Sequence, residues 1–378
     1  MELGMYNSYL EVDFTKIKDA YLKTKAAIGP RQDILPVLKA NAYGIGALKM
    51  AEFLVQTLGT QILAVAQVFE GAELREAGFR SIDILVMGAP PHHVLPYAVQ
   101  YDLQTPVFRM EDADLLDAEA ARQGKTAKVQ IKIETGMNRI GVKPGEKLAE
   151  LLNHLKTLKH LKVTGIYTHF ANATVTDDSF TPIQYGLFKE AVAQVKAAGF
   201  ALQYIHCRNT GATEWFREDL CTHVRPGSLY MGYASMDDHT NALHVQESTS
   251  WRAFVTNVHE LQPGESAGYG RHFMAEKPTM VATIDVGYAD GIFRPLAQAG
   301  GPVLVNETKT RYLVCAMDQT IVDVTNINCK VGDEVTLYGW TSSGKTCLPL
   351  EELEIFSDQT LAYNMCAVSR RVKRIYKY

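Results

Sequence analysis

The stretch LPVLKANAYGIG, Leu35–Gly46, indicates how the first half of the chain folds. An apolar run ends abruptly at Lys39, and small residues, Tyr43 and two glycines follow. A buried parallel strand ends at a loop in this way, and α/β proteins keep their functional side chains at that carboxyl end. An apolar environment there favours the neutral amine of a lysine, the form that attacks a carbonyl carbon. Position alone is equally compatible with an ordinary surface lysine, since lysine is seldom buried.

Short apolar runs alternate with amphipathic stretches from about residue 10 to residue 240. The pattern predicts strands, each followed by a helix, at residues 34–38, 61–65, 82–87, 128–133, 163–167 and 204–207. Strands that alternate with helices pair in parallel, and seven or eight such units are what a (β/α)8 barrel requires. We therefore expect a barrel domain over residues 1–245.

The second part of the chain, residues 246–378, has a different texture. β-branched runs such as TSWRAFVTNVHEL and PTMVATIDVGYAD are separated by turn residues, and only residues 350–356 and 360–367 have a helical pattern. This alternation is typical of antiparallel strands joined by hairpins. We expect a mostly β C-terminal domain.

Composition indicates a cytoplasmic enzyme. The 378 residues are 47% hydrophobic, carry a net charge of −4 and have a mean hydropathy of −0.09. Charges of both signs are interspersed, which argues against binding to nucleic acid or to an anionic membrane. The chain has no apolar run long enough to span a bilayer, and its start lacks the pattern of a signal peptide. No metal site is expected, and the six scattered cysteines are expected to be small buried side chains rather than disulfides.

Leu35–Gly46 resembles the pyridoxal-phosphate lysine segment of the alanine racemases, the barrel-type enzymes that use this cofactor. The match includes Lys39 and Tyr43 and departs at Ile45, where the family usually has histidine. Further segments that resemble the family follow in the family's order over nearly the whole chain. The resemblance implies that Lys39 binds pyridoxal 5'-phosphate as a Schiff base.

Racemisation requires removal of the Cα proton from one face and its return on the other, so two bases are expected. Lys39 is the first, and the resemblance of GESAGYGRHF implies that Tyr269 is the second and acts in the other subunit. His169 resembles the histidine that contacts this tyrosine, and Arg225 resembles the arginine that faces the pyridine nitrogen. A guanidinium keeps its proton, so it restrains the ring as an electron sink. Taken singly, the tyrosine, histidine and arginine could each be ordinary structural residues.

The cofactor phosphate needs donors, and late barrel strands are where barrels usually supply them. Tyr43 offers a hydroxyl, Asn209 and Thr210 follow a predicted strand, and Gly227 and Ser228 offer backbone amides. In the family the segment around Asn209 usually reads Asn-Ser-Ala. This chain keeps the asparagine and exchanges one hydroxyl residue for another.

Substrate contacts are implied by three further matches. Arg139, in IKIETGMNRIGV, corresponds to the arginine near the substrate carboxylate, and Lys132 to a lysine that is carbamylated in many members. A simple charge pair between Lys132 and Glu134 is an alternative. Tyr288 matches a tyrosine of the substrate entrance, and Met317 matches the methionine whose backbone binds the carboxylate across the dimer.

Two further positions depart from the family pattern. Ala362 stands where most members have a tyrosine that touches the phosphate and walls the substrate pocket. Tyr363 is one residue later, which on a helix is rotated by about 100°, so it replaces that side chain only if the backbone shifts. Val314 stands where an arginine is usual.

These observations together predict a pyridoxal-phosphate-dependent racemase that interconverts L- and D-alanine as a homodimer with shared active sites. Ala362 keeps open a racemase or related enzyme for serine or a bulkier amino acid. A non-catalytic pyridoxal-phosphate carrier is a more distant alternative, because Tyr269, Met317 and the C-terminal domain argue against it. A barrel decarboxylase is weaker still, because the tyrosine-bearing GYGRHF segment has no obvious use there.

Overall fold

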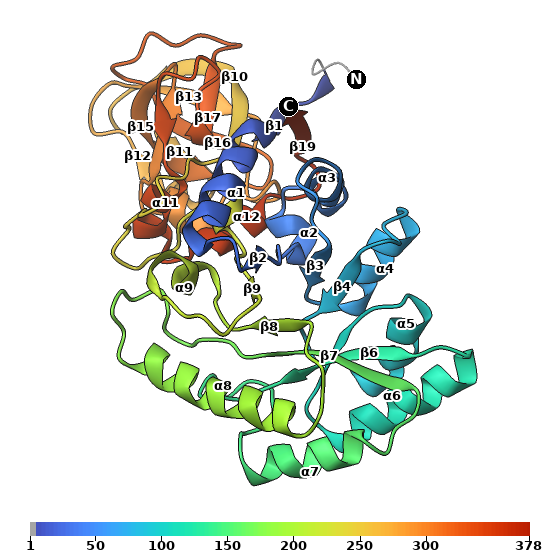
Figure 1. Cartoon of the computed structure of the whole chain (residues 1–378). Coiled ribbons are helices and arrows are strands. Elements are labelled where there is room, and N and C mark those ends of the chain that lie inside the picture. The colour runs from blue at the N-terminus through green and yellow to red at the C-terminus, as the bar shows by residue number, and fades with distance from the viewer. Residues whose placement is uncertain (1–4) are drawn as a thin grey trace. The chain divides into compact units, whose positions relative to one another are not determined.

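The computed structural model describes residues 5–378, which form two compact units. The barrel unit consists of residues 18–42 and 47–245. The β unit consists of residues 43–46 and 246–378 together with the N-terminal segment through Ile17. Figure 1 shows the chain, coloured from blue at the N-terminus to red at the C-terminus.

Parallel strands close the barrel. Within residues 5–378 they number eight: β2 (Asp33–Ile34), β3 (Ile62–Val65), β4 (Asp83–Val86), β5 (Thr105–Val107), β6 (Ala127–Lys132), β7 (Leu161–Tyr167), β8 (Tyr204–His206) and β9 (His223–Val224). β3 pairs with β4, β5 through β8 pair in order, and β9 pairs with β2. Backbone bridges join the rest: Val37 to Ala64, Leu85 to Gln104, and the Thr222 amide to the Ile205 carbonyl. The (β/α)8 prediction is confirmed.

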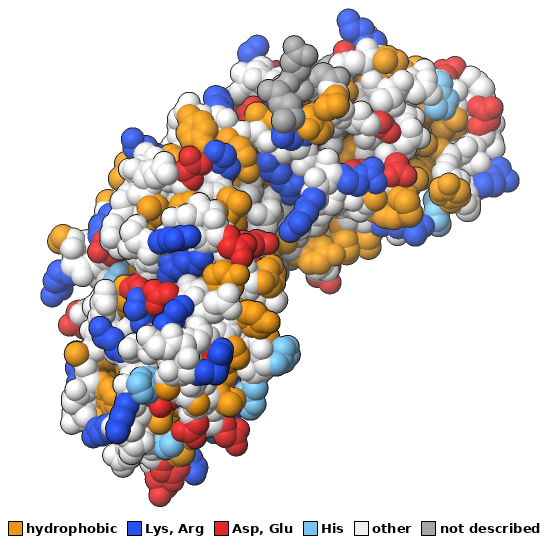
Figure 2. Space-filling view, turned by 90° about the vertical axis from the view of Figure 1, so that its right-hand side faces the viewer, with side chains coloured by type: hydrophobic (Ala, Val, Ile, Leu, Met, Phe, Trp, Pro, Cys, Tyr) orange, Lys and Arg blue, Asp and Glu red, His pale blue; other side chains and the backbone are white. Residues whose placement is uncertain are grey.

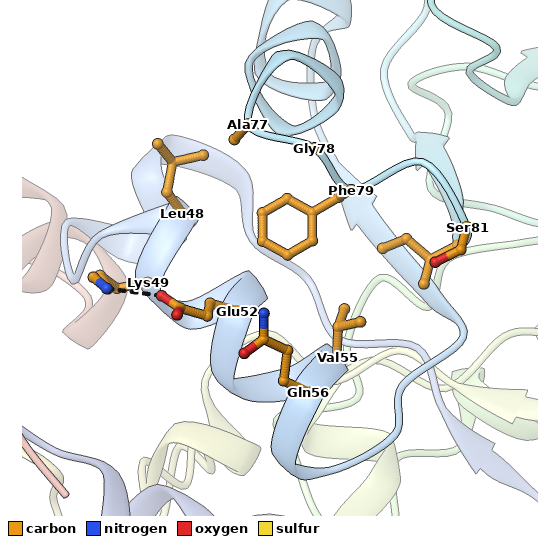
Figure 3. A pocket seen from close by; sticks show the side chains of 10 residues that line it. Leu48, Lys49, Glu52, Val55, Gln56, Ala77, Gly78, Phe79 and Ser81 are labelled. Carbon is orange, nitrogen blue, oxygen red and sulfur yellow. Dashed lines mark hydrogen bonds and ion pairs between the residues drawn. The ribbon is translucent and has the colours of Figure 1, made fainter.

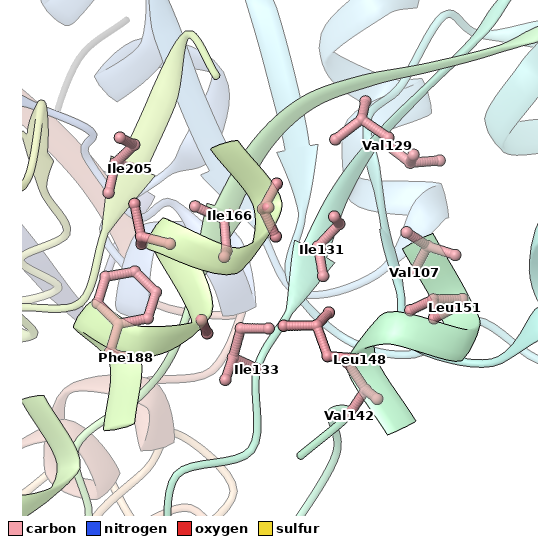
Figure 4. Packing of buried hydrophobic residues seen from close by; sticks show 14 of the residues in the cluster. Val107, Val129, Ile131, Ile133, Val142, Leu148, Leu151, Ile166, Phe188 and Ile205 are labelled. Atoms are coloured by element: carbon pink, nitrogen blue, oxygen red, sulfur yellow. The ribbon is translucent and has the colours of Figure 1, made fainter. Parts of the chain in front are cut away.

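Helices follow the barrel strands. They are α3 (Ala47–Glu52), which continues as a π-helix (Phe53–Thr57), α4 (Val68–Glu76), α5 (Leu95–Gln100), which follows a 3-10 turn (His92–Val94), α6 (Met110–Gln123), α7 (Glu146–Leu155), α8 (Phe180–Ala197) and α9 (Thr210–Trp215). α7 buries Leu148, Leu151, Leu152 and Leu155, one helical stripe. Figure 4 shows Leu148 and Leu151 in one cluster of buried side chains that also includes Ile131 of β6 and Phe188 of α8. The sequence pattern missed β5 and α6.

The β unit contains a nine-stranded sheet in the order β18-β17-β14-β15-β16-β13-β10-β1-β19. Its strands are β1 (Ser8–Asp13), β10 (Thr249–Leu261), β13 (Thr279–Ile284), β14 (Pro302–Val305), β15 (Thr308–Cys315), β16 (Thr320–Asp323), β17 (Glu334–Trp340), β18 (Cys347–Leu348) and β19 (Lys373–Lys377). β1 pairs antiparallel with β10 and parallel with β19. β1 thus joins the sheet of the β unit, although it precedes the barrel strands in the chain.

Helices and a small hairpin complete the architecture. α1 (Phe14–Ile28) follows β1, and the helices of the C-terminal part are α10 (Arg294–Gln298), α11 (Leu350–Ser357) and α12 (Leu361–Ala367). α10 was not expected, whereas α11 and α12 were. The hairpin of β11 (Ser266–Ala267) and β12 (Phe273–Met274) packs on a small core that includes Ala267, Val281 and Val314.

The surface agrees with the mixed charge of the sequence. Figure 2 shows Lys and Arg side chains interspersed with Asp and Glu side chains on the face in view. No helix among residues 5–378 is long and apolar enough to cross a membrane. Cys207, Cys221 and Cys315 are buried, as expected, but Cys366 is exposed. The cytoplasmic location stays a prediction.

Candidate active site

Lys39 begins α2 (Lys39–Tyr43), and the turn that follows it is left-handed. Ala40, Asn41, Ala42 and Tyr43 all have φ between 52° and 57°. The left-handed conformation costs roughly 1–2 kcal/mol for each residue with a Cβ, so surrounding contacts must hold it.

The start of this turn is fixed by side chains of the barrel unit. The Ala40 amide donates to the Glu70 carboxylate at 2.6 Å, and Glu70 also accepts from Ala66 and Gln67. The Asn41 side chain accepts from the Ala47 amide at 2.8 Å. Lys39 is thereby fixed at the end of its strand, as the sequence predicted.

Arg225, one residue after β9, lies at the same rim of the barrel and is 3% exposed. Its guanidinium donates to Nδ1 of His206 at 2.5 Å, to Nδ1 of His169 at 3.1 Å and to the Thr168 carbonyl at 2.8 Å. It also lies 5.4 Å from the ring centroid of Tyr167. The structure thus brings Arg225 and His169 together.

A hydrogen-bonded chain keeps His206 neutral. Because Nδ1 accepts from Arg225, Nε2 carries the proton and donates to Gln130 at 2.7 Å, and Gln130 donates to Gln104. Burial, together with the charge of Arg225, lowers the pKa of His206 well below its usual value, and the same causes lower the pKa of His169. Neither imidazole is a cation at neutral pH.

Lys132, at the end of β6, is 3% exposed. Its ammonium group donates to the Ile133 carbonyl at 2.8 Å and lies 5.5 Å from the Tyr167 ring centroid. Burial, then the charges of Arg225 and Arg139, lower its pKa to about 7, so that the neutral amine is available near pH 7.

Lys132 is only one of several groups that stabilise the ionised form of Glu134. Burial raises the pKa of Glu134, but hydrogen bonds from the Asn138 and Gly136 amides and the charge of Lys132 bring it below the usual value. Arg139 is exposed in the same turn, and its charge acts on both Lys132 and His169.

The predicted phosphate donors form a small nest on the same rim. The amides of Gly227 and Ser228 both donate to the Thr210 hydroxyl, at 2.9 and 3.3 Å. Asn209 is the N-cap of α9 and accepts from the Ala212 amide. Two amides that converge on one oxygen are the arrangement that phosphate oxygens require, so the residues present fit this end of pyridoxal phosphate.

The cavity drawn in Figure 3 lies elsewhere in the barrel unit. It encloses about 590 Å³ between α3, the π-helix and the segment after α4, and Phe79 and Glu52 are among the side chains that line it. The residues predicted for the active site do not line it.

In the β unit, Tyr269 lies in the loop between β11 and β12 and is 81% exposed. The preceding Gly268 has φ +74°, and a Cβ there would lie 2.2 Å from Val314. Tyr288 and Met317 are also exposed and lie on adjoining segments, because the Tyr288 amide donates to the Ala316 carbonyl and the Ala289 amide to the Met317 carbonyl.

Tyr363 follows Ala362 on α12 and is 45% exposed. Its ring packs edge-on against Phe293, with centroids 5.3 Å apart, and lines a cavity of about 440 Å³ that Tyr288 and Arg294 also line. Ala362 presents only a methyl group on α12.

Two family models match this chain. The model described as "Alanine racemase, N-terminal domain" matches residues 12–235, and "Alanine racemase, C-terminal domain" matches residues 248–376. The chain belongs to the alanine racemase family.

Curated relatives and solved structures agree with this assignment. "Alanine racemase" of Halothermothrix orenii is 35% identical over 98% of this chain and 97% of its own length, and that of Methanococcus maripaludis is 32% identical over 97% and 98%. A Clostridium difficile alanine racemase structure covers 98% of this chain and 96% of its own, with 27% identity and a TM-score of 0.91. A Bartonella henselae alanine racemase "with covalently bound pyridoxal phosphate" covers 98% and 99%, with 25% identity and a TM-score of 0.85.

The sequence interpretation missed the residues that support Arg225. His206 and Gln130 lie within predicted strands, where a period-2 pattern assigns a polar residue to the solvent-facing side. Histidine or glutamine in a buried strand needs hydrogen-bond partners inside the barrel, and this need could have identified His206 and Gln130 as part of a buried network.

Proposed function

We propose that this protein is a pyridoxal-phosphate-dependent racemase that interconverts L- and D-alanine with two bases, Lys39 and Tyr269. The observation that carries the proposal is Arg225, a buried guanidinium bonded to two neutral histidines at the same barrel rim as Lys39. Bound pyridoxal phosphate would supply an electron sink for the Cα carbanion of the substrate.

The cofactor would be held at both ends by residues of this chain. Lys39 would bind it covalently through its amine, while Thr210, Gly227 and Ser228 would donate to its phosphate, with Asn209 and Tyr43 beside them. Arg225 would donate a hydrogen bond to the pyridine nitrogen. Because guanidinium does not release its proton at neutral pH, Arg225 would leave that nitrogen unprotonated and limit side reactions of the carbanion.

The proton would leave one face of Cα for one base and return from the other base on the opposite face. A phenol has an ordinary pKa near 10, so Tyr269 needs help from its surroundings to act as a base at neutral pH. His169 is neutral and has one ring N–H, so it can bond a phenolic oxygen and stabilise it without competing for the proton.

The substrate carboxylate would be held by Arg139 and the backbone of Met317. Lys132 would orient Arg139 after carbamylation, which requires the neutral amine that burial makes available near pH 7. The carbamate is an anion, so it would also relieve the crowding of cationic groups formed by Lys132, Arg139 and Arg225.

The site would be completed by a second copy of the chain. Tyr269, Tyr288 and Met317 are 81%, 41% and 52% exposed on the β unit, where the active-site groups of a homodimeric partner could meet them. A tyrosine so exposed contributes little to the core of its own unit, which favours a functional role.

A racemase for serine or a bulkier amino acid is the second candidate. Ala362 presents a methyl group where the family usually has a tyrosine, and the ring of Tyr363 packs on Phe293. Deuterium wash-in at Cα, measured for alanine, serine and larger amino acids, distinguishes the two, since alanine should exchange fastest if the first proposal is right.

The proposal is tested with two substitutions and a control. Lys39→Ala should lose the absorbance at about 420 nm of a pyridoxal phosphate–lysine conjugate and all racemisation. Tyr269→Phe should keep the absorbance and slow racemisation at least about 100-fold. Tyr97→Phe, which removes an exposed hydroxyl from α5, should change neither. Persistent colour in Lys39→Ala, or a wild-type rate in Tyr269→Phe, would refute the two-base assignment.

A further inference from the structure

The left-handed turn after Lys39 runs into Gly44–Gly46, and the C-terminal strand holds this segment inside the β unit. Nε of Arg374 donates to the Gly44 carbonyl at 2.9 Å. The hydroxyl of Tyr376 donates to the Ile45 carbonyl at 3.0 Å. Both side chains belong to β19, which pairs with β1 at the edge of the sheet.

Arg374 connects this segment to the end of α12. In residues 5–378 its guanidinium makes four hydrogen bonds, all to backbone carbonyls: those of Gly44, Val368 at 2.6 Å, Val372 at 2.7 Å and Ser369. Arginine suits this task because its donors are fixed in a planar fork, whereas lysine offers one charged point.

The approach between the two segments is very close. A Cβ on Gly44 would lie 2.6 Å from the Met365 carbonyl oxygen, and one on Gly46 would lie 2.1 Å from the Tyr376 hydroxyl. Tyr376 is itself fixed, since its ring stacks on Phe14 with centroids 5.6 Å apart. The segment therefore has no space to move closer to β19, and the hydrogen bonds from Arg374 and Tyr376 oppose its movement away.

Tyr43 directly precedes Gly44, and Lys39 is four residues earlier in the same strained turn. A strained turn persists only when its surroundings hold it. Glu70 holds its start, and Arg374 and Tyr376 hold its end. If the end were released, the turn could relax and move both the lysine amine and the tyrosine hydroxyl.

We propose that Arg374 and Tyr376 are positioning residues that fix the Lys39–Gly46 turn and thereby determine how tightly this protein binds pyridoxal phosphate. The inference rests on the proposed function, in which Lys39 and Tyr43 contact the cofactor. Neither β19 residue is itself assigned a contact with cofactor or substrate.

The test compares Arg374→Lys and Tyr376→Phe with wild-type protein in titrations of the apoprotein with pyridoxal phosphate, followed by absorbance and tryptophan fluorescence. Arg374→Lys keeps the charge but loses the fork, and the dissociation constant should rise at least about tenfold. Tyr376→Phe keeps the stacked ring and loses one hydrogen bond, for which we expect a rise of about three- to tenfold. Release of cofactor during dialysis should accelerate in the same order.

Arg75→Lys is the matched control. Arg75 also donates to four backbone carbonyls, those of Phe79, Ile82, Tyr101 and Asp102, but in the outer part of the barrel unit. Arg75→Lys should lower the melting temperature of the apoprotein and leave the dissociation constant within about twofold of wild type.

The inference is overturned if Arg374→Lys melts earlier, as the control does, but binds the cofactor as wild type. If Arg374→Lys does not fold, Tyr376→Phe decides, and wild-type affinity in that variant also overturns it. Failure of the proposed function is distinguishable, because wild-type protein would then bind no pyridoxal phosphate, or Lys39→Ala would keep the conjugate's absorbance.

Discussion

Replacing Glu247 with glutamine should make the protein more stable, by an amount that grows with pH. One carboxylate oxygen of Glu247 accepts from the Leu350 amide at 2.7 Å, at the start of α11, but the other is buried without a hydrogen-bond partner in the described chain. Burial raises the pKa of Glu247 to about 8 from an ordinary 4.5, and the charges of Glu351 and Glu352 raise it further. The hydrogen bond from Leu350 and the charge of Lys16 lower it, but their effect is smaller in sum.

The sign follows from proton linkage. The folded protein keeps the Glu247 proton up to about pH 8, whereas the unfolded chain releases it near pH 4.5, so ionisation favours the unfolded state as the pH rises between these values. At 1.36 kcal/mol for each pH unit, the loss of stability is about 1 kcal/mol at pH 5 and about 3 kcal/mol at pH 7. Glutamine has no proton to release, so Glu247→Gln should escape this loss.

The assay is urea unfolding of the apoproteins at pH 5, 7 and 8.5, followed by tryptophan fluorescence. Other titrating groups are common to both proteins, so the difference in unfolding free energy isolates Glu247. Glu276→Gln, an exposed change elsewhere in the β unit, is the control and should show no comparable trend. A stability difference between Glu247→Gln and wild type that stays constant or shrinks from pH 5 to pH 8.5 would refute the reasoning.

Two further predictions concern activity. Bicarbonate should restore the racemisation rate of enzyme stripped of CO₂. The effect should grow as the pH rises through about 7, because the neutral amine of Lys132 forms the carbamate. Lys132→Ala should not respond to bicarbonate in the same rate assay. Gly268→Ala should slow racemisation at least about tenfold with the cofactor still bound, because its Cβ would lie 2.2 Å from Val314, next to Tyr269. Gly264→Ala has the same left-handed strain, at φ +90°, but open space, and should stay within about twofold of wild type. Equal losses in the two glycine variants would contradict the reasoning.

The barrel was predictable because its strands and helices carry their own periodicity. β6 and α7 illustrate this, since a strand that alternates apolar and polar residues is followed by a helix with leucines three and four residues apart. The segment of β5 and α6 was missed because its strand has only three residues, TPV, and includes a proline. The place of β1 could not be read from its pattern, because pairing with β10 and β19 is a contact between distant parts of the chain.

Some residues of the candidate site could likewise be predicted from the sequence, and others could not. Arg225 stands directly after β9, and Lys39, Thr210 and Ser228 lie in the segments that follow β2, β8 and β9. The sequence predicted that Lys39 and Thr210 follow strands of one barrel, and the barrel unit brings Arg225 to His169 and Thr210 to Ser228. His206 escaped because its role depends on two partners, Arg225 and Gln130, that the sequence does not connect. The meeting of Tyr269 with Lys39 stays a prediction, since it depends on a second copy of the chain.

The composition of the segment KANAYGIG follows from its backbone rather than from side-chain chemistry alone. Four consecutive residues at φ near 55° exclude β-branched side chains, and asparagine tolerates this region best among residues with a Cβ. Gly44 and Gly46 are required for a second reason, the approach of the Met365 carbonyl and the Tyr376 hydroxyl, so even a strain-free alanine would not fit. Ile45 between them is 1% exposed, and it is held through its carbonyl, so the backbone contact does not depend on which side chain stands there. The segment is therefore constrained by the chemistry of Lys39 at its start and by the C-terminal strand at its end.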